Sequence, residues 1–170
     1  MLNIKNDKNY LNIVEYILDD KEFDKMNNIR HHCSNRYDHS LKVSYYSYKI
    51  AKLFKLNYEE VARAGLLHDF YFESTLDYKN PTDKVMLFTT VHPMQALKNA
   101  EDRFNLSEKE KDIIKTHMFP LDFRLPKYME SWIVNIVDTF LSTCEFTQKF
   151  SYKFSYVINL YLLVILNSIK

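Results

Sequence analysis

The sequence predicts an all-α protein that forms a single domain. Only one glycine, Gly65, and four prolines occur among the 170 residues. Sheet proteins need glycine in tight turns with a positive φ angle, so its scarcity disfavours β-hairpins. Apolar residues recur at helical spacing along most of the chain, and no internal repeat is present. A chain of this length can bury a substantial core as one domain.

The expected helices follow one another with short polar connections. Asn57 is expected to cap one helix, and Pro93 suits the first turn of another. Ser107 and Glu110 form a capping box. The segment YFESTLDYKNPTDK, residues 71–84, predicts a loop. In chain order, helices are expected at residues 9–20, 39–54 and 58–69, just before 90, from 93, after 107, at 129–145 and at 152–168.

The composition limits the kind of protein. A net charge of +1 gives no electrostatic reason to bind nucleic acid or an acidic membrane surface. Two cysteines, Cys33 and Cys144, cannot build a disulfide framework, and the N-terminus has no apolar signal segment, so a cytoplasmic protein is expected. With a single glycine, every glycine-rich phosphate loop is excluded.

Three parts are expected within the domain. Residues 1–30 form an N-terminal helix packed on the domain, and residues 31–145 form its functional core. Residues 146–170 contain an apolar helix with no charge from Phe154 to Ser168. That stretch is shorter than the roughly 18–20 residues a membrane span needs, so no membrane role is expected. We expect this helix to pack on the core or at a subunit interface, which is compatible with a homodimer.

Several polar side chains fall on the apolar faces of the expected helices. His39, for example, lies four residues before Val43, and His68 follows Val61 by seven. Any one of them has an ordinary explanation as a core histidine bonded to a carbonyl. Six at inward positions on five helices point to a shared function. They are His39, His68, Asp69, His92, His117 and Asp138.

Metal ions would satisfy all of these groups together. Each buried polar group without a partner costs about 1–3 kcal/mol, and a bare buried carboxylate costs far more. A mixture of neutral imidazoles and carboxylates suits divalent iron, manganese, cobalt, nickel or zinc. The sequence therefore predicts a buried site for a divalent transition metal.

The order of these residues resembles the HD-domain superfamily of metal-dependent phosphohydrolases. The resemblance covers about residues 30–145, and its motifs are RYDHSLKV, AGLLHDF, HP, KTHMFP and NIVDTF. It implies an HD-domain helical bundle with an HD metal-dependent hydrolase core at 31–145. It also implies a first metal on His39, His68, Asp69 and Asp138. His92 and His117 match the ligands of a second metal, with Asp69 as the bridge, so two ions are expected.

The resemblance implies hydrolysis of a phosphoester or phosphoanhydride by a metal-activated water. The expected substrate is a nucleotide or another small phosphorylated metabolite. Asp69 and His68 are the expected catalytic residues, with Asp69 placed to receive the proton of the water. Because no glycine loop exists, substrate phosphate would be held by side chains, for which Arg36, Arg124 and Lys127 are the candidates.

The sequence departs from the superfamily pattern directly after the His-Asp pair. Many dinuclear members have glycine and lysine there, but this chain has Tyr71 and Phe72. A cyclic dinucleotide or a dinucleoside polyphosphate is therefore disfavoured as substrate. The two aromatic side chains would either stack on a substrate ring or pack in the core.

Two other functions remain open at the level of sequence. Some HD-fold proteins hold two irons on the same ligands and cleave a carbon bond in a small polyol or phosphonate with oxygen. A non-catalytic HD sensor that binds a nucleotide is the second alternative. A hydrolase is favoured over the oxygenase because phosphate-type ligands are more usual for such a site. The complete set of six metal-binding residues argues against a sensor that has lost its activity.

Overall fold

The computed structural model describes residues 4–31, 34–72 and 87–147. The prediction of an all-α fold is confirmed. A helix over residues 129–147 follows the labelled helices, and one antiparallel pair of two-residue strands joins β1 (Arg30–His31) to β2 (Ser34–Asn35). The labelled α-helices are α1 (Lys8–Leu18), α2 (Lys21–Asp24), α3 (Arg36–Leu53), α4 (Tyr58–Leu67), α6 (His92–Glu101) and α7 (Glu108–Thr116).

Shorter helical turns connect these elements. They are the 3-10 turns η1 (Ile4–Asn6) and η2 (Lys25–Asn28) and the π-helical turn η4 (Leu87–Val91). The short helix expected just before residue 90 is thus a π turn. The predicted apolar helix at 152–168 and most of the predicted loop at 71–84 lie outside the described residues.

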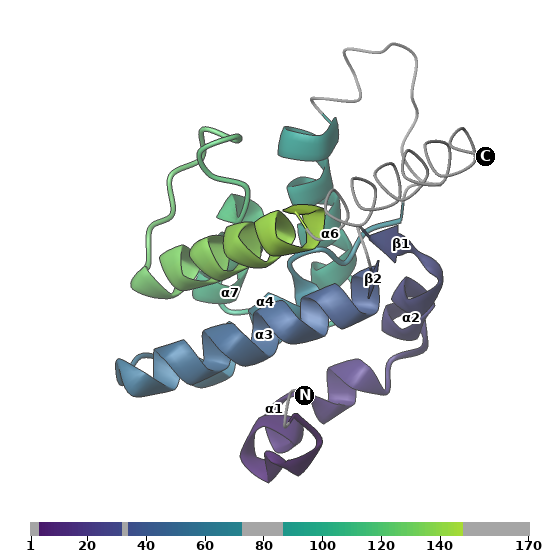
Figure 1. The fold of residues 1–170 in the computed structure, drawn as a ribbon, viewed down its shortest axis with the longest axis vertical. Helices are drawn as coiled ribbons and strands as arrows, with labels where there is room; N and C mark the ends of the chain where they lie inside the picture. The colour runs from purple at the N-terminus through teal and green to yellow at the C-terminus, as the bar shows by residue number, and fades with distance from the viewer. Residues whose placement is uncertain (1–3, 32–33, 73–86, 148–170) are drawn as a thin grey trace, which may run out of the picture.

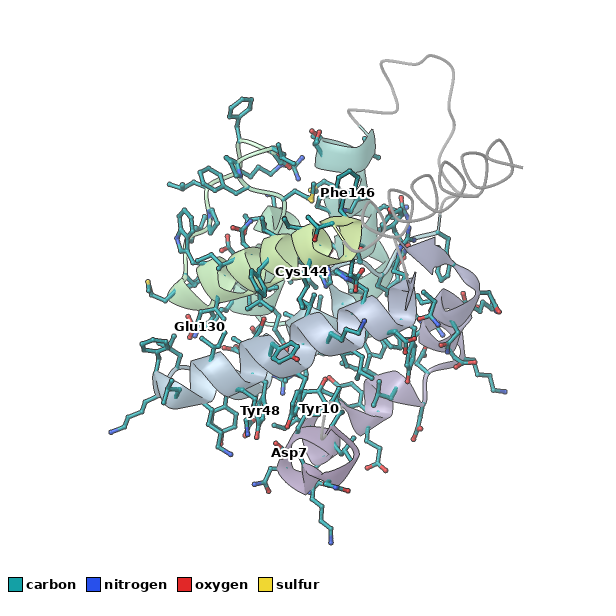
Figure 2. All side chains as sticks on the ribbon, viewed as in Figure 1. Asp7, Tyr10, Tyr48, Glu130, Cys144 and Phe146 are labelled. Atoms are coloured by element: carbon teal, nitrogen blue, oxygen red, sulfur yellow. The ribbon has the colours of Figure 1, made fainter. Side chains whose placement is uncertain are left out.

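Helix α3 is the central element of the described fold (Figure 1). The N-terminal helix α1 packs on one side of α3. In this contact the ring centre of Tyr10 on α1 is 5.3 Å from that of Tyr48 on α3 (Figure 2). The 129–147 helix crosses its other side, where Lys42 pairs with Glu145 at 3.3 Å. Helices α4, α6 and α7 close the back of the bundle in this view.

A single apolar face on the helix expected at 39–54 would bury the apolar side chains along it, and this expectation is wrong for three of them. Tyr46, Leu53 and Phe54 are exposed, whereas small polar residues on the same helix are buried. The reason is that α3 packs against neighbours on more than one side, so a single apolar stripe does not describe it. The buried small residues are Ser40, Ser44, Ser47 and Ala51.

The single glycine lets α3 and α4 approach each other closely. A Cβ atom at Gly65 would lie 2.8 Å from the Cα atom of Ser44, nearer than real side chains come. The hydroxyl of Ser44 donates to the carbonyl of Ala62 at 2.5 Å, so the serine satisfies its own polar group within the contact. This approach places His39 of α3 beside His68 at the end of α4, with ring centres 5.7 Å apart.

The predicted helix caps are confirmed. The side chain of Asn57 accepts from the backbone N–H of Glu60, and Ser107 and Glu110 form both bonds of the capping box. Pro93 lies in the first turn of α6. In the part of the chain that the structure describes, no helix combines the length and apolar character that crossing a membrane requires.

The start of the 129–147 helix is fixed by a buried carboxylate of α7. Asp112 Oδ2 accepts from the backbone N–H of Lys127 at 2.9 Å and from the hydroxyl of Ser131 at 2.7 Å. At the same end of the helix, Glu130 accepts from the ammonium of Lys109 at 2.6 Å. These bonds hold the helix against α7, which sets the position of Asp138 further along it.

Replacing Gly65 with alanine tests the α3–α4 contact. Alanine is the better helix former by about 1 kcal/mol, so at an uncrowded position the change would stabilise the protein. Because the new Cβ would meet the backbone of Ser44, we expect a net loss of about 1–3 kcal/mol in the free energy of unfolding by denaturant titration. Lys98→Ala, at an exposed position of α6, is the control and should change it by less than about 0.5 kcal/mol. A more stable Gly65→Ala protein would contradict the close approach.

Candidate metal centre

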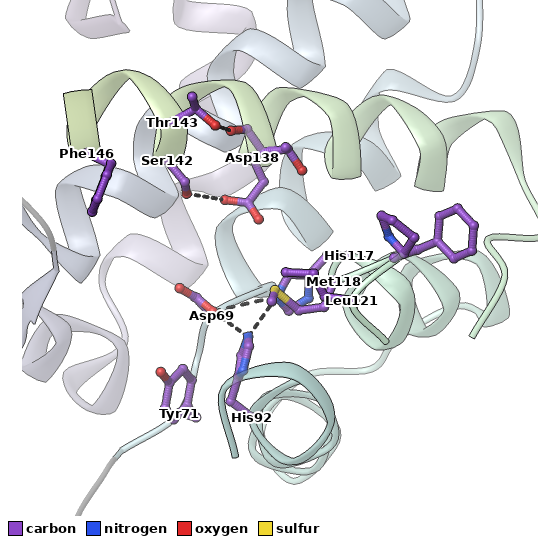
Figure 3. Close-up of a pocket in the computed structure, with 13 residues that line it drawn as sticks. Asp69, Tyr71, His92, His117, Met118, Leu121, Asp138, Ser142, Thr143 and Phe146 are labelled. Atoms are coloured by element: carbon purple, nitrogen blue, oxygen red, sulfur yellow. Dashed lines mark hydrogen bonds and ion pairs between the residues drawn. The ribbon is translucent and has the colours of Figure 1, made fainter. Parts of the chain in front are cut away.

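The fold brings the six predicted metal-binding residues together. They come from α3, the residues that follow α4 and α7, the start of α6 and the 129–147 helix. All six side chains are buried, with at most 8% of any residue exposed. Figure 3 shows four of them, Asp69, His92, His117 and Asp138, around one pocket.

Two of the imidazoles have a fixed tautomer. His68 and His117 each follow the last residue of a helix, where the final carbonyls have no partner within the helix. The Nδ1 atom of His68 is 2.8 Å from the carbonyl of Gly65, and that of His117 is 2.8 Å from the carbonyl of Ile114. A carbonyl only accepts, so Nδ1 carries the proton and Nε2 keeps the lone pair that a metal needs.

One group of ligands gathers around His68. The Nε2 atom of His68 is buried without a hydrogen-bond partner. It lies 3.7 Å from Oδ1 of Asp138 and 3.9 Å from Oδ2 of Asp69. His39 Nε2 lies 2.9 Å from Oδ1 of Asp138. A cation among these atoms would bind the His68 lone pair, which no protein donor satisfies.

A second group lies on the other side of Asp69. Its Oδ1 atom is 3.4 Å from Nε2 of His92 and 3.7 Å from Nε2 of His117. The two Nε2 atoms are 3.0 Å apart. Since His117 carries its proton on Nδ1, a proton of His92 or a cation must lie between the two nitrogen atoms.

The two groups share the Asp69 carboxylate. Ligand atoms of His39, His68 and Asp69 all lie within 4.8 Å of one another, and so do those of Asp69, His92 and His117. One carboxylate oxygen is nearer each group, as a bridging ligand requires. The donor set of imidazoles and carboxylates fits a divalent transition metal in both positions.

Sequence reasoning did not identify Glu145, whose carboxylate lies beside Nδ1 of His39, the nitrogen that faces away from Asp138. Its Oε2 atom lies 3.5 Å from Nδ1 of His39, and its Oε1 atom lies 3.3 Å from Nζ of Lys42. A carboxylate on the outer nitrogen of a ligating imidazole orients the ring and makes it a stronger ligand. The signal was present, because Glu145 follows Asp138 by seven residues and lies on the same helix face.

The pKa values of His39 and His117 are shifted in opposite directions. Burial alone would lower the pKa of His39, but its bonds to Asp138 and Glu145 raise that pKa to about 10. Burial, with the neighbouring His68 and His92, lowers the pKa of His117 to about 3. In the protein without metal, His39 is therefore protonated near neutral pH and His117 is neutral.

Four of the six candidate ligands, Asp69, His92, His117 and Asp138, form the floor of a pocket of about 510 Å³. Hydroxyl groups of the 129–147 helix and apolar side chains complete its lining, and no lysine or arginine occurs among the lining residues that the structure describes. The remaining lining residues are Tyr71, Met118, Phe119, Pro120, Leu121, Thr139, Ser142, Thr143 and Phe146.

The three predicted phosphate ligands do not line this pocket. The buried guanidinium of Arg36 lies 3.8 Å above the ring of Tyr71 and donates to its hydroxyl at 2.9 Å and to its carbonyl at 2.7 Å. Tyr71 in turn has its ring centre 5.0 Å from that of His92. Arg124 and Lys127 line a separate hollow near α7. Their role as phosphate ligands stays a prediction.

Comparison with known proteins gives one family. The family model described as HD domain matches residues 36–141. The matched segment contains all six predicted metal-binding residues and ends before Glu145. No curated protein and no solved structure matches the chain.

The role of Glu145 is tested by Glu145→Gln. The variant keeps the shape of the side chain but removes the charge beside His39. We expect the affinity for Mn²⁺ or Zn²⁺ to fall about 10–100-fold in a chelator competition titration. The control is Glu101→Gln, on the surface of α6, which should bind as tightly as the natural protein. Unchanged affinity in Glu145→Gln would contradict the supporting role.

Metal affinity should also depend on pH through His39. A protonated imidazole cannot bind a cation, so binding must release the proton of His39. Because the pKa of His39 is about 10 without metal, the proton is present throughout the neutral range. Competition with it should make the affinity for Zn²⁺ rise about tenfold from about pH 7 to pH 8. An affinity that does not change over this interval would be the contrary result.

Proposed function

The chain belongs to the HD domain family, whose members are in general metal-dependent hydrolases, and on this basis we propose that it is a phosphohydrolase. The proposed reaction cleaves a phosphoester or phosphoanhydride of a nucleotide or another small phosphorylated metabolite with water. The observation that carries the proposal is the pair of ligand groups that share Asp69 at the floor of a pocket. The proposed location is the cytoplasm.

Two divalent ions, of iron, manganese, cobalt, nickel or zinc, are proposed as cofactors. His39, His68, Asp69 and Asp138 would hold one ion, and Asp69, His92 and His117 would hold the other. Such ions supply Lewis acidity, which makes water a nucleophile near neutral pH and offsets the charge of a phosphoryl group. All six side chains are buried, so they exclude bulk water on the inner side of the site.

The proposed catalytic residues are Asp69 and His68. Asp69 lies at the pocket lining, where a carboxylate oxygen can take the proton of the attacking water. The bond from Nδ1 of His68 to Gly65 keeps its Nε2 atom directed at Asp69 and Asp138. The attack forms the new oxygen–phosphorus bond, and the leaving oxygen takes up a proton as its bond to phosphorus breaks.

The di-iron oxygenase uses the same ligands and is separated from the hydrolase by experiment. A hydrolase releases phosphate without oxygen and with redox-inert Zn²⁺ or Mn²⁺. An oxygenase requires iron and consumes oxygen. The nucleotide sensor would bind a nucleotide and release no phosphate at all.

The first test of the proposal is phosphate release by metal-loaded protein. The protein would be loaded with each candidate metal and assayed without oxygen on a panel of nucleotides and simple phosphate esters. We expect release to fall by about 10²-fold or more in Asp69→Asn, because the carboxylate shared by both ligand groups loses its charge. Asp102→Asn, at an exposed position after α6, is the matched control and should keep full activity. Equal rates in Asp69→Asn and the natural protein would contradict the proposal.

The second test separates the two ions. The Nε2 atom of His117 lies near Oδ1 of Asp69 and Nε2 of His92, so His117→Ala should lose the ion of that group and keep the other. Elemental analysis should give about two metals per chain for the natural protein and about one for the variant. Two metals in His117→Ala would return this residue to the role of an ordinary core histidine.

A further inference from the structure

The pocket has two chemically different sides. Asp69, His92, His117 and Asp138 supply its polar floor. The opposite wall is made by the segment that follows α7 and by the end of the 129–147 helix. The apolar side chains of this wall are Met118, Phe119, Pro120, Leu121 and Phe146.

Parts of the apolar wall are open to water. Leu121 is 66% exposed and Phe146 is 60% exposed, although both line the pocket. In Figure 3, Phe146 lies on the same helix as Asp138 and Ser142, one turn beyond Ser142. When a ligand covers large apolar side chains beside a polar site, the apolar surface leaves water and the free energy of the complex falls. Their position therefore favours a ligand that has an apolar part next to its reacting group.

The polar groups of the wall offer little charge to a ligand. Among the described lining residues there is no lysine or arginine, and the nearest buried guanidinium, that of Arg36, is held on Tyr71. The hydroxyl of Ser142 donates to Asp138 at 3.3 Å, and that of Thr143 donates to the carbonyl of Thr139 at 2.7 Å. The part of the substrate that lies away from the metal-binding residues is therefore recognised mainly by apolar contacts.

We infer that the substrate is a phosphate ester of an alcohol with an apolar ring, and that Phe146 determines this specificity. The inference rests on the proposed hydrolase function and names its substrate class. The phosphate lies over the polar floor of the pocket, and the ring lies against Phe119, Leu121 and Phe146. Water adds to phosphorus, the bond from phosphorus to the alcohol oxygen breaks, and the alcohol leaves with a proton, so the products are the alcohol and inorganic phosphate.

The test compares two alkyl esters with similar leaving groups. Phenethyl phosphate carries a ring that ethyl phosphate lacks, and the leaving oxygen is a primary alcohol in both. We expect kcat/KM for phenethyl phosphate to exceed that for ethyl phosphate by about tenfold or more, the effect of burying one ring. The non-hydrolysable phosphonates of the same two groups should show a similar ratio of Kd values in metal-loaded protein.

Two phenylalanine variants locate the effect. Phe146→Ala should reduce both ratios by about threefold or more, because the ring of phenethyl phosphate loses its contact with Phe146. Phe140→Ala removes a ring that is 65% exposed on the same helix but does not line the pocket, and it should change neither ratio. If Phe146→Ala fails to fold, Leu121→Ala replaces it with the same expected result.

The outcomes separate the inference from the function on which it rests. Equal kcat/KM values for the two esters, together with equal phosphonate affinities, would overturn the inference and leave the hydrolase intact. A preference for phenethyl phosphate that survives both wall variants would overturn the role of Phe146. If neither ester releases phosphate while the panel of nucleotides does, the ring-bearing ester is wrong as a substrate. No release from any substrate would reject the hydrolase itself.

Discussion

The buried carboxylate of Asp69 is the group on which the rest of the site depends. It lies among the imidazoles of His68, His92 and His117, with one oxygen nearer His68 and the other nearer the remaining two. A bare carboxylate at such a depth is unfavourable unless cationic partners compensate it. The Nδ1 atoms of His68 and His117 donate to backbone carbonyls at the ends of α4 and α7. Their Nε2 atoms are therefore directed toward Asp69. The carbonyls at two helix ends thereby orient imidazoles of the candidate metal site.

Helical periodicity was enough to predict that the six candidate metal ligands face inward, because each lies on a face whose apolar neighbours are also buried. Capping chemistry likewise predicted Asn57, Pro93 and Ser107 at their helix starts. Periodicity failed for α3, since a helix that packs on more than one side buries small serines and exposes Leu53. Glu145 was missed although its spacing of seven residues places it on the helix face of Asp138, because it contacts His39 and does not line the pocket.

The two sides of the pocket come from different kinds of structure. The floor consists of residues in helices or directly after them, and buried contacts fix these helices, such as the approach of Gly65 to Ser44. The apolar wall comes from the segment after α7 and from the last described turns of the 129–147 helix, where Leu121 and Phe146 remain exposed. In the proposed hydrolase, the reaction would depend on the floor, and the choice of substrate would depend on the wall.

The most direct test of the account is a crystal structure of the manganese-loaded protein with anomalous diffraction at the metal edge. The account predicts two anomalous peaks per chain, one on each side of Asp69, each about 2.0–2.2 Å from one of its oxygens. The first peak should contact His39, His68 and Asp138, and the second should contact His92 and His117. No peak beside Asp69, or a single peak that leaves His92 and His117 bonded only to each other, would contradict the shared carboxylate.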